Sequence, residues 1–217
     1  MSTHSRNNCM RFLDEIIESR RSIRSFKEDM PPKDAIMGVI RAGLFAPYAG
    51  VLAQSDFRRF VVIQKGSPTM TKVKKMMNLH VKSMLERLKL EMQQDPALQS
   101  RAQKFAKILE TASIQGLPGV GTAPYFVVVA ERRGFPSVEQ QSLAHCLQNM
   151  WLKATALDLG FQLVSATAEM AEDKEFCDLL GIPFKEFEIN GCAVGYPSIK
   201  LPPAQRQDVE KVTSWLD

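Results

Sequence analysis

Four short apolar runs, separated by segments with helical periodicity, limit the folds open to this 217-residue chain. The runs cover residues 57–64, 125–130, 161–165 and 187–194, and each has the length and composition of a buried strand. No internal repeat or low-complexity linker interrupts the alternation. Strands that alternate with helices form a sheet covered by helices, so we expect an α/β or α+β fold and a single domain over residues 1–217.

Apolar residues at three- and four-residue steps predict the helices around these strands, at residues 10–19, 33–46, 138–159 and 171–180. The longest such segment, residues 68–115, is amphipathic. Asp95-Pro96 divides it, since this pair is typical of a helix N-terminus. Gly160 follows the expected helix 138–159 and is predicted to be its C-terminal cap.

Composition and cysteine spacing exclude several classes of protein. The four cysteines (Cys9, Cys146, Cys177 and Cys192) lie far apart with no CxxC pair, and none of the three histidines stands at helical spacing from another. We therefore expect reduced, mostly buried thiols and no metal site. No apolar run is long enough to span a bilayer, and the polar N-terminus has no signal-peptide pattern. These features predict a cytoplasmic protein with no membrane partner.

The positive charge of the chain is concentrated in its middle. Residues 70–109 hold nine Lys and Arg against three Asp and Glu, whereas the whole chain holds 28 against 24. Such a block can attract nucleic acid or an anionic membrane. It contains a single aromatic residue, Phe105, and so offers no stacking platform for bases. We expect no nucleic-acid partner.

Three guanidiniums and a hydroxyl lie within five positions: Arg20, Arg21, Ser22 and Arg24. Such a group can bind a phosphate through charge-assisted, bidentate hydrogen bonds. The alternative is a solvated basic turn paired with the acidic residues before it, which are Asp14, Glu15 and Glu18. Neither a dinucleotide-binding GxGxxG motif nor a Walker A loop occurs in the chain. The residues alone leave both interpretations open.

The string SRRSIRSF at residues 19–26 resembles the opening signature of the nitroreductase family of FMN flavoproteins. Further similarities follow in chain order: APYAG at 46–50, FVVI at 60–63, AP at 123–124, LQNMWL at 147–152, ALDLG at 156–160, LGIP at 180–183, GYP at 195–197, and Arg206. The match covers roughly residues 10–66 and 120–217. It implies an α+β, three-layer α/β/α fold with a mixed, mainly antiparallel central sheet flanked by helices.

The resemblance also implies an FMN site and assigns residues to it. The phosphate and ribityl contacts would come from Arg20, Arg21, Ser22 and Arg24, with Arg206 closing on the phosphate. The backbone of Ser165, Ala166, Thr167 and Ala168 would pass the N5 edge of the flavin, where an N–H would bond to N5. Pro47, Tyr48, Ala49 and Gly50 would lie beside the isoalloxazine on the other side.

Members of this family are homodimers with one FMN in each of two interface clefts, so residues 209–215 would cross onto the partner. The resemblance implies hydride transfer from NADH or NADPH to flavin N5 and then to a nitroaromatic, quinone or similar small-molecule acceptor, by a ping-pong mechanism. The cofactor carries this chemistry, so no catalytic side chain is expected.

The chain also departs from the family pattern. Tyr48 and Val51 replace the usual Ser and Asn, and residues 53–57 replace the usual QPW triplet, so contacts to the pyrimidine edge of the flavin differ. Three interpretations stay open: an oxidoreductase, a flavin store or sensor without efficient turnover, and a dehalogenase or flavin-cleaving relative. The segment 68–115 is expected to be a helical insertion, either a lid over the substrate or a helix in the dimer.

Overall fold

A four-stranded sheet lies at the centre of the computed structural model, which describes residues 12–48, 50, 56–202 and 204–216. The strands are β1 (Arg58–Gln64), β2 (Tyr125–Arg132), β3 (Gly160–Val164) and β4 (Phe187–Gly195). Their order is β1-β2-β4-β3, and all neighbours are antiparallel. At the β3 edge Ser22 forms a parallel bridge with Phe161, which makes the pairing mixed. All four predicted strands are confirmed.

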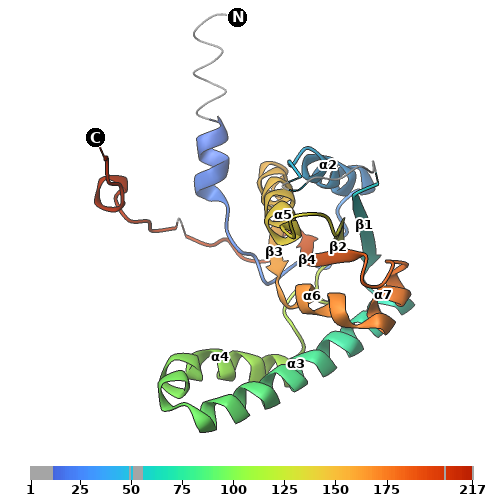
Figure 1. Ribbon diagram of the computed structural model, residues 1–217. Coiled ribbons are helices and arrows are strands. Elements are labelled where there is room, and N and C mark those ends of the chain that lie inside the picture. The colour runs from blue at the N-terminus through green and yellow to red at the C-terminus, as the bar shows by residue number, and fades with distance from the viewer. Residues whose placement is uncertain (1–11, 49, 51–55, 203, 217) are drawn as a thin grey trace, which may run out of the picture.

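Helices cover both faces of this sheet (Figure 1). On one face lie α2 (Lys33–Leu44) and α5 (Glu139–Ala156); on the other lie α3 (Pro68–Gln94), α6 (Ala166–Glu169), η1 (Met170–Glu172) and α7 (Lys174–Leu180). The central strand β2 alternates between the two cores, with Phe126 and Val128 in one and Val127 and Val129 in the other. It therefore reads as an unbroken apolar run. The expected three-layer α/β/α fold is confirmed.

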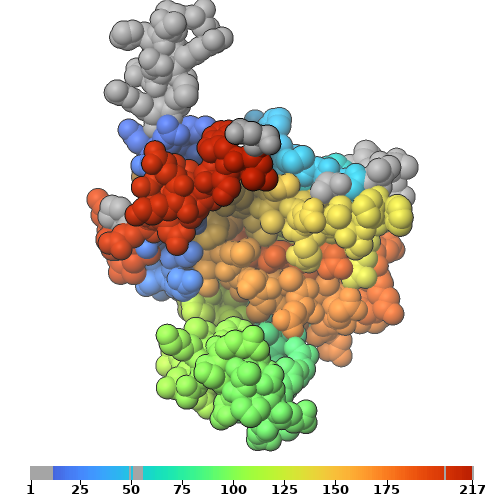
Figure 2. All heavy atoms as spheres, turned by 60° about the vertical axis from the view of Figure 1, so that its left-hand side comes forward, coloured from blue at the N-terminus to red at the C-terminus, as the bar shows by residue number. Residues whose placement is uncertain are grey.

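The segment 68–115 forms a helical hairpin of α3 and α4 (Pro96–Gln115) that stands out from the sheet (Figures 1 and 2). The carboxylate of Asp95 accepts the N–H groups of Ala97 at 2.8 Å and Leu98 at 3.1 Å, so the predicted cap at Asp95-Pro96 is confirmed. The hairpin has a small core of its own, formed by Val81, Leu85, Ala106, Leu109 and Ala112. No helix in the described part of the chain combines the length and apolar composition that crossing a membrane requires.

The predicted C-terminal cap at Gly160 is wrong. Helix α5 ends at Ala156, and Asp158 takes the left-handed conformation, with φ of 55°. Gly160 is instead the first residue of β3, where a Cβ atom would lie 2.7 Å from Cγ2 of Ile23. A glycine is needed there because the segment before α2 packs closely on β3, not because a helix ends.

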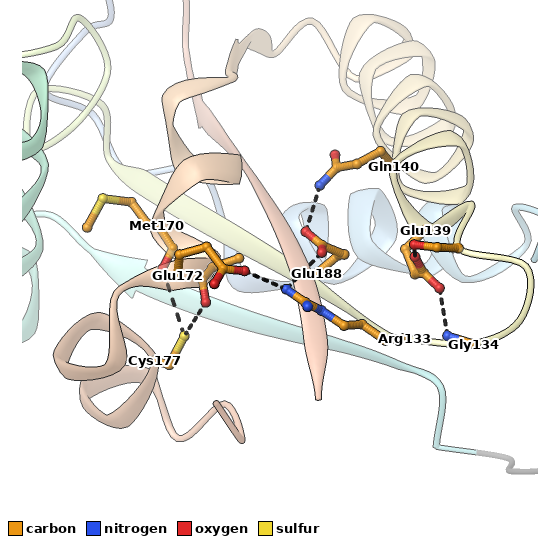
Figure 3. Close-up of polar contacts among 10 residues, drawn as sticks. Arg133, Gly134, Glu139, Gln140, Met170, Glu172, Cys177 and Glu188 are labelled. Atoms are coloured by element: carbon orange, nitrogen blue, oxygen red, sulfur yellow. Dashed lines mark hydrogen bonds and ion pairs between the residues drawn. The ribbon is translucent and has the colours of Figure 1, made fainter. Parts of the chain in front are cut away.

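Polar contacts fix η1 and α5 against the sheet (Figure 3). The guanidinium of Arg133 lies 2.8 Å from Glu172 of η1 and 2.9 Å from Glu188 of β4. Gln140 at the start of α5 donates to Glu188 at 3.2 Å, and the buried carboxylate of Glu139 accepts the N–H of Gly134 at 2.6 Å. These contacts join η1 and the start of α5 to the ends of β2 and β4.

The three cysteines of the described residues (Cys146, Cys177 and Cys192) are buried and free. Burial raises the pKa of Cys146 to about 12 and that of Cys192 well above its ordinary value. It also raises the pKa of Cys177, whose thiol donates to the carbonyl of Ala171 at 3.6 Å and to that of Met170 (Figure 3). Cys9 lies outside the described residues.

Folded protein carrying Cys9→Ser is therefore expected to be inert towards a thiol reagent such as Ellman's reagent at pH 8. Reaction needs both access and a thiolate, and these buried sulfurs lack both. Addition of denaturant should release three reactive thiols per chain. Rapid labelling of the native variant would contradict the burial of these residues.

Candidate functional site

A cavity of 230 Å³ gathers the arginines that the sequence marks out. Its lining consists of Arg20, Arg21, Ser22, Arg24, Leu201, Ala204 and Arg206. The run is held in place by β3, since Ile23 donates its N–H to the carbonyl of Phe161 at 3.0 Å. Among the described residues no acidic side chain lines the cavity, and no ion pair joins this run to Asp14, Glu15 or Glu18. The structure thus favours an anion site over a paired basic turn.

The positive charges in this cavity repel one another. Burial, and then the charges of Arg206 and Arg21, lower the pKa of the half-buried Arg20. Its guanidinium lies 4.3 Å from the ring centroid of Trp151, and the indole N–H of Trp151 donates to the carbonyl of Arg21 at 3.2 Å. Trp151 of helix α5 therefore packs against the arginine run and holds its backbone. An anion would relieve the repulsion among these guanidiniums.

A second cavity, of 830 Å³, adjoins the first, since Arg24 lines both. On one side lie residues 162–166 and Ala168 of the β3–α6 segment; on the other lie apolar side chains of the hairpin, including Val81, Met84, Phe105, Ile108 and Leu109. A cavity of this size, largely apolar with a few polar groups, is typical of a site for an organic ligand.

Some residues of the β3–α6 segment line the larger cavity and others are buried away from it. Ser165, Ala166 and Ala168 line the larger cavity. The side chain of Thr167 is fully buried and points towards Gly191, where a Cβ atom would lie 2.5 Å from its hydroxyl oxygen. The N–H of Ala168 donates to the carbonyl of Ser165 at 2.9 Å. A backbone contact to a ligand would thus come from another residue of this segment.

Pro47, Tyr48 and Gly50 line neither cavity, and Ala49 lies outside the described residues. Tyr48 donates its hydroxyl to the carbonyl of Arg132 at 3.4 Å, at the end of β2. Burial, followed by the charges of Glu139 and Glu131, raises the pKa of Tyr48, which keeps the phenol neutral. Because β1 and β3 are opposite edges of the sheet, one chain does not bring this loop to the arginine cavity.

Arg58 holds this loop, and no motif in the sequence predicts that role. Its side chain is 1% exposed and pairs with the fully buried Glu131 at 3.0 Å. It also donates to the carbonyls of Gly43 at 2.8 Å, Ala46 at 3.0 Å and Pro47 at 3.3 Å. Arg58 stands directly before an apolar run, which suggests that its charge is partly buried. The sequence does not show that its partners are Glu131 and three backbone carbonyls.

The residues present fit a ligand such as FMN. The smaller cavity offers guanidiniums and the Ser22 hydroxyl to a phosphate, and the larger one offers apolar walls to a planar ring system. Arg24 stands between them, so one ligand can occupy both. No group of three or more His, Cys, Asp or Glu that could hold a metal ion occurs in the described residues.

A family model and several solved structures match the chain. The model of the nitroreductase family matches residues 17–196. No curated protein matches the chain. A nitroreductase with bound FMN from Bacteroides fragilis NCTC 9343 is 17% identical with a TM-score of 0.67, over 94% of this chain and 98% of that one.

Two other solved structures have the same fold. A BluB-like flavoprotein from Clostridium difficile 630 is 21% identical with a TM-score of 0.71, over 94% of this chain and 99% of that one. An iodotyrosine deiodinase bound to FMN and 3-iodo-L-tyrosine is 19% identical with a TM-score of 0.64, over 90% and 95% of the two chains. At such identities the likeness shows the fold alone.

Proposed function

This chain belongs to the nitroreductase family, and from that premise we propose that it is a cytoplasmic, FMN-dependent oxidoreductase. NADH or NADPH is the proposed reductant, and the proposed acceptor is a nitroaromatic, quinone or similar small molecule. The observation that carries the proposal is the arginine cavity, which is lined by no carboxylate of the described residues and adjoins a larger apolar cavity through Arg24.

The residues divide the work of binding. Arg20, Arg21, Ser22 and Arg206 would bind the phosphate of FMN, and Arg24 would lie between the phosphate and the ring. Bound FMN would supply hydride transfer between a nicotinamide and the acceptor. Apolar residues of the hairpin, such as Phe105 and Ile108, line one side of the larger cavity and would cover a ligand bound there. This arrangement supports the lid role of segment 68–115 over a role in dimer packing alone.

A homodimer would complete the site. The helix of residues 12–19 exposes Phe12, Leu13 and Ile17, and the C-terminal segment exposes Val209, Val212, Trp215 and Leu216, the last two by 88% and 95%. Both segments extend away from the sheet (Figure 1). Apolar side chains left this exposed are typical of an interface. In the proposed dimer the partner supplies its own Pro47–Gly50 loop to the isoalloxazine.

The visible absorption spectrum of the purified protein tests the proposal. We expect a flavin band that bleaches when NADH or NADPH is added without oxygen, and that returns when menadione or a nitrofuran is added. A band that persists with both nucleotides would indicate a flavin store or sensor. A colourless protein that takes up no added FMN would contradict the assignment of the arginine cavity.

A further inference from the structure

One buried polar atom beside the larger cavity has no hydrogen-bond partner among the described residues. Gln162, in β3, is 8% exposed and lines the cavity with Arg24 and Ser165. Its Oε1 atom is buried and accepts no hydrogen bond from the described residues. Buried amides nearly always have a partner, because an unpaired one loses the free energy of its bonds to water.

The loop between α4 and β2 leaves space for this amide. Gly119 has φ of 81°, and a Cβ atom there would lie 2.9 Å from Oε1 of Gln162 and 2.6 Å from Cβ of Ala193. A side chain at position 119 would therefore collide with the carboxamide. Gly119 therefore leaves space for the carboxamide of Gln162, although the Oε1 atom of this group bonds to no described residue.

A carboxamide has an acceptor and a donor side by side. A half-turn about its last torsion exchanges Oε1 and Nε2 with little change of shape, so either atom can face the cavity. The matching ligand edge carries an N–H next to a C=O in one plane. The pyrimidine ring of a flavin has such an imide edge, at N3–H and its flanking carbonyls.

We propose that the carboxamide of Gln162 binds the imide edge of the flavin ring. The inference rests on the proposed function, since it requires FMN in the larger cavity. Two features favour this edge over a polar group of the acceptor. The carboxylate of Glu169, also in the cavity lining, is already engaged by Arg87 at 3.5 Å and lies 3.3 Å from Nε2 of His80. Val51 stands where the family pattern has Asn, and a valine side chain forms no hydrogen bond.

N3-methyl-FMN tests the contact, because methylation removes the N3–H and leaves the phosphate intact. The wild-type protein is expected to bind FMN about tenfold more tightly than N3-methyl-FMN, as measured by quenching of flavin fluorescence. Gln162→Leu, with a side chain of similar size, should bind the two within about twofold of each other. Gln115→Leu, on the exposed wall of the same cavity, is the matched control and should keep the tenfold preference.

Each outcome decides between the proposals. If Gln162→Leu keeps the tenfold preference, the methyl group acts by its size and the Gln162 inference fails while FMN binding stands. Equal affinities in the wild type also refute it. A wild-type protein that binds neither flavin overturns both the inference and the proposed function. Gln162→Met fills the same space and replaces the leucine variant if that variant does not fold.

Discussion

Replacing Arg20 with glutamine is expected to weaken FMN binding by about 10- to 100-fold. A hydrogen bond to a charged group contributes roughly 1.5–3 kcal/mol, and each 1.4 kcal/mol is a tenfold change in affinity. Arg20 is partly buried, unlike the exposed Arg24 and Arg206, and its pKa is lowered by burial and then by the charges of Arg206 and Arg21. Its charge is therefore less screened by water than that of an exposed arginine. Titration of FMN fluorescence at fixed ionic strength measures the change.

Two controls separate phosphate binding from general damage to the fold. Arg41→Gln removes a charge from the exposed face of α2 and should leave FMN binding unchanged. Riboflavin, which has no phosphate, should bind the wild type and the Arg20→Gln variant with similar affinity. If the variant loses riboflavin as strongly as FMN, Arg20 supports the fold or the ring site and not the phosphate. If it loses neither, the cavity is not the phosphate site.

Much of the fold follows from local patterns in the sequence. The run 125–130 is apolar at every position, and the structure places it as β2, buried on both faces of the sheet. Asp95-Pro96 predicts a helix start because a proline needs no N–H at that position and an aspartate accepts two free ones. Such rules act within a few residues, so the sequence alone suffices for them.

Long-range contacts are less accessible from the sequence. Arg206 joins Arg20 across most of the chain, and only the family resemblance placed them together. Gly160 satisfies the rule for a helix cap, but a tertiary contact with Ile23 decides its place. Gln162 interrupts an apolar run, and its buried Oε1 atom has no partner among the described residues. A ligand that binds such an atom is not part of the chain, so the sequence does not reveal it. The position of Tyr48 relative to the arginines depends on association with a second chain, which no local pattern describes.

Replacing Arg58 with methionine is expected to lower the free energy of unfolding by about 3–5 kcal/mol, because it leaves the buried carboxylate of Glu131 without a cation. The carbonyls of Gly43, Ala46 and Pro47 also lose their donor. Methionine keeps the apolar stem of the side chain, so the loss comes from the guanidinium. Urea denaturation with linear extrapolation measures the change.

Variants of Glu131 distinguish the contribution of the ion pair from that of side-chain packing. Burial raises the pKa of Glu131 despite Arg58, so the carboxylate is costly to keep charged and Glu131→Gln should destabilise less than Arg58→Met. A carboxyl whose pKa is raised on folding contributes stability at low pH and loses it as pH rises through the folded pKa. Without Arg58 that pKa rises further, so the deficit of Arg58→Met should be smaller at pH 5 than at pH 8.

Arg58→Met with Glu131→Leu should recover part of the loss, since no unpaired charge remains buried. A deficit that is independent of pH and unchanged in the double variant would show that the fold needs the bonds of Arg58 to the carbonyls rather than its charge beside Glu131.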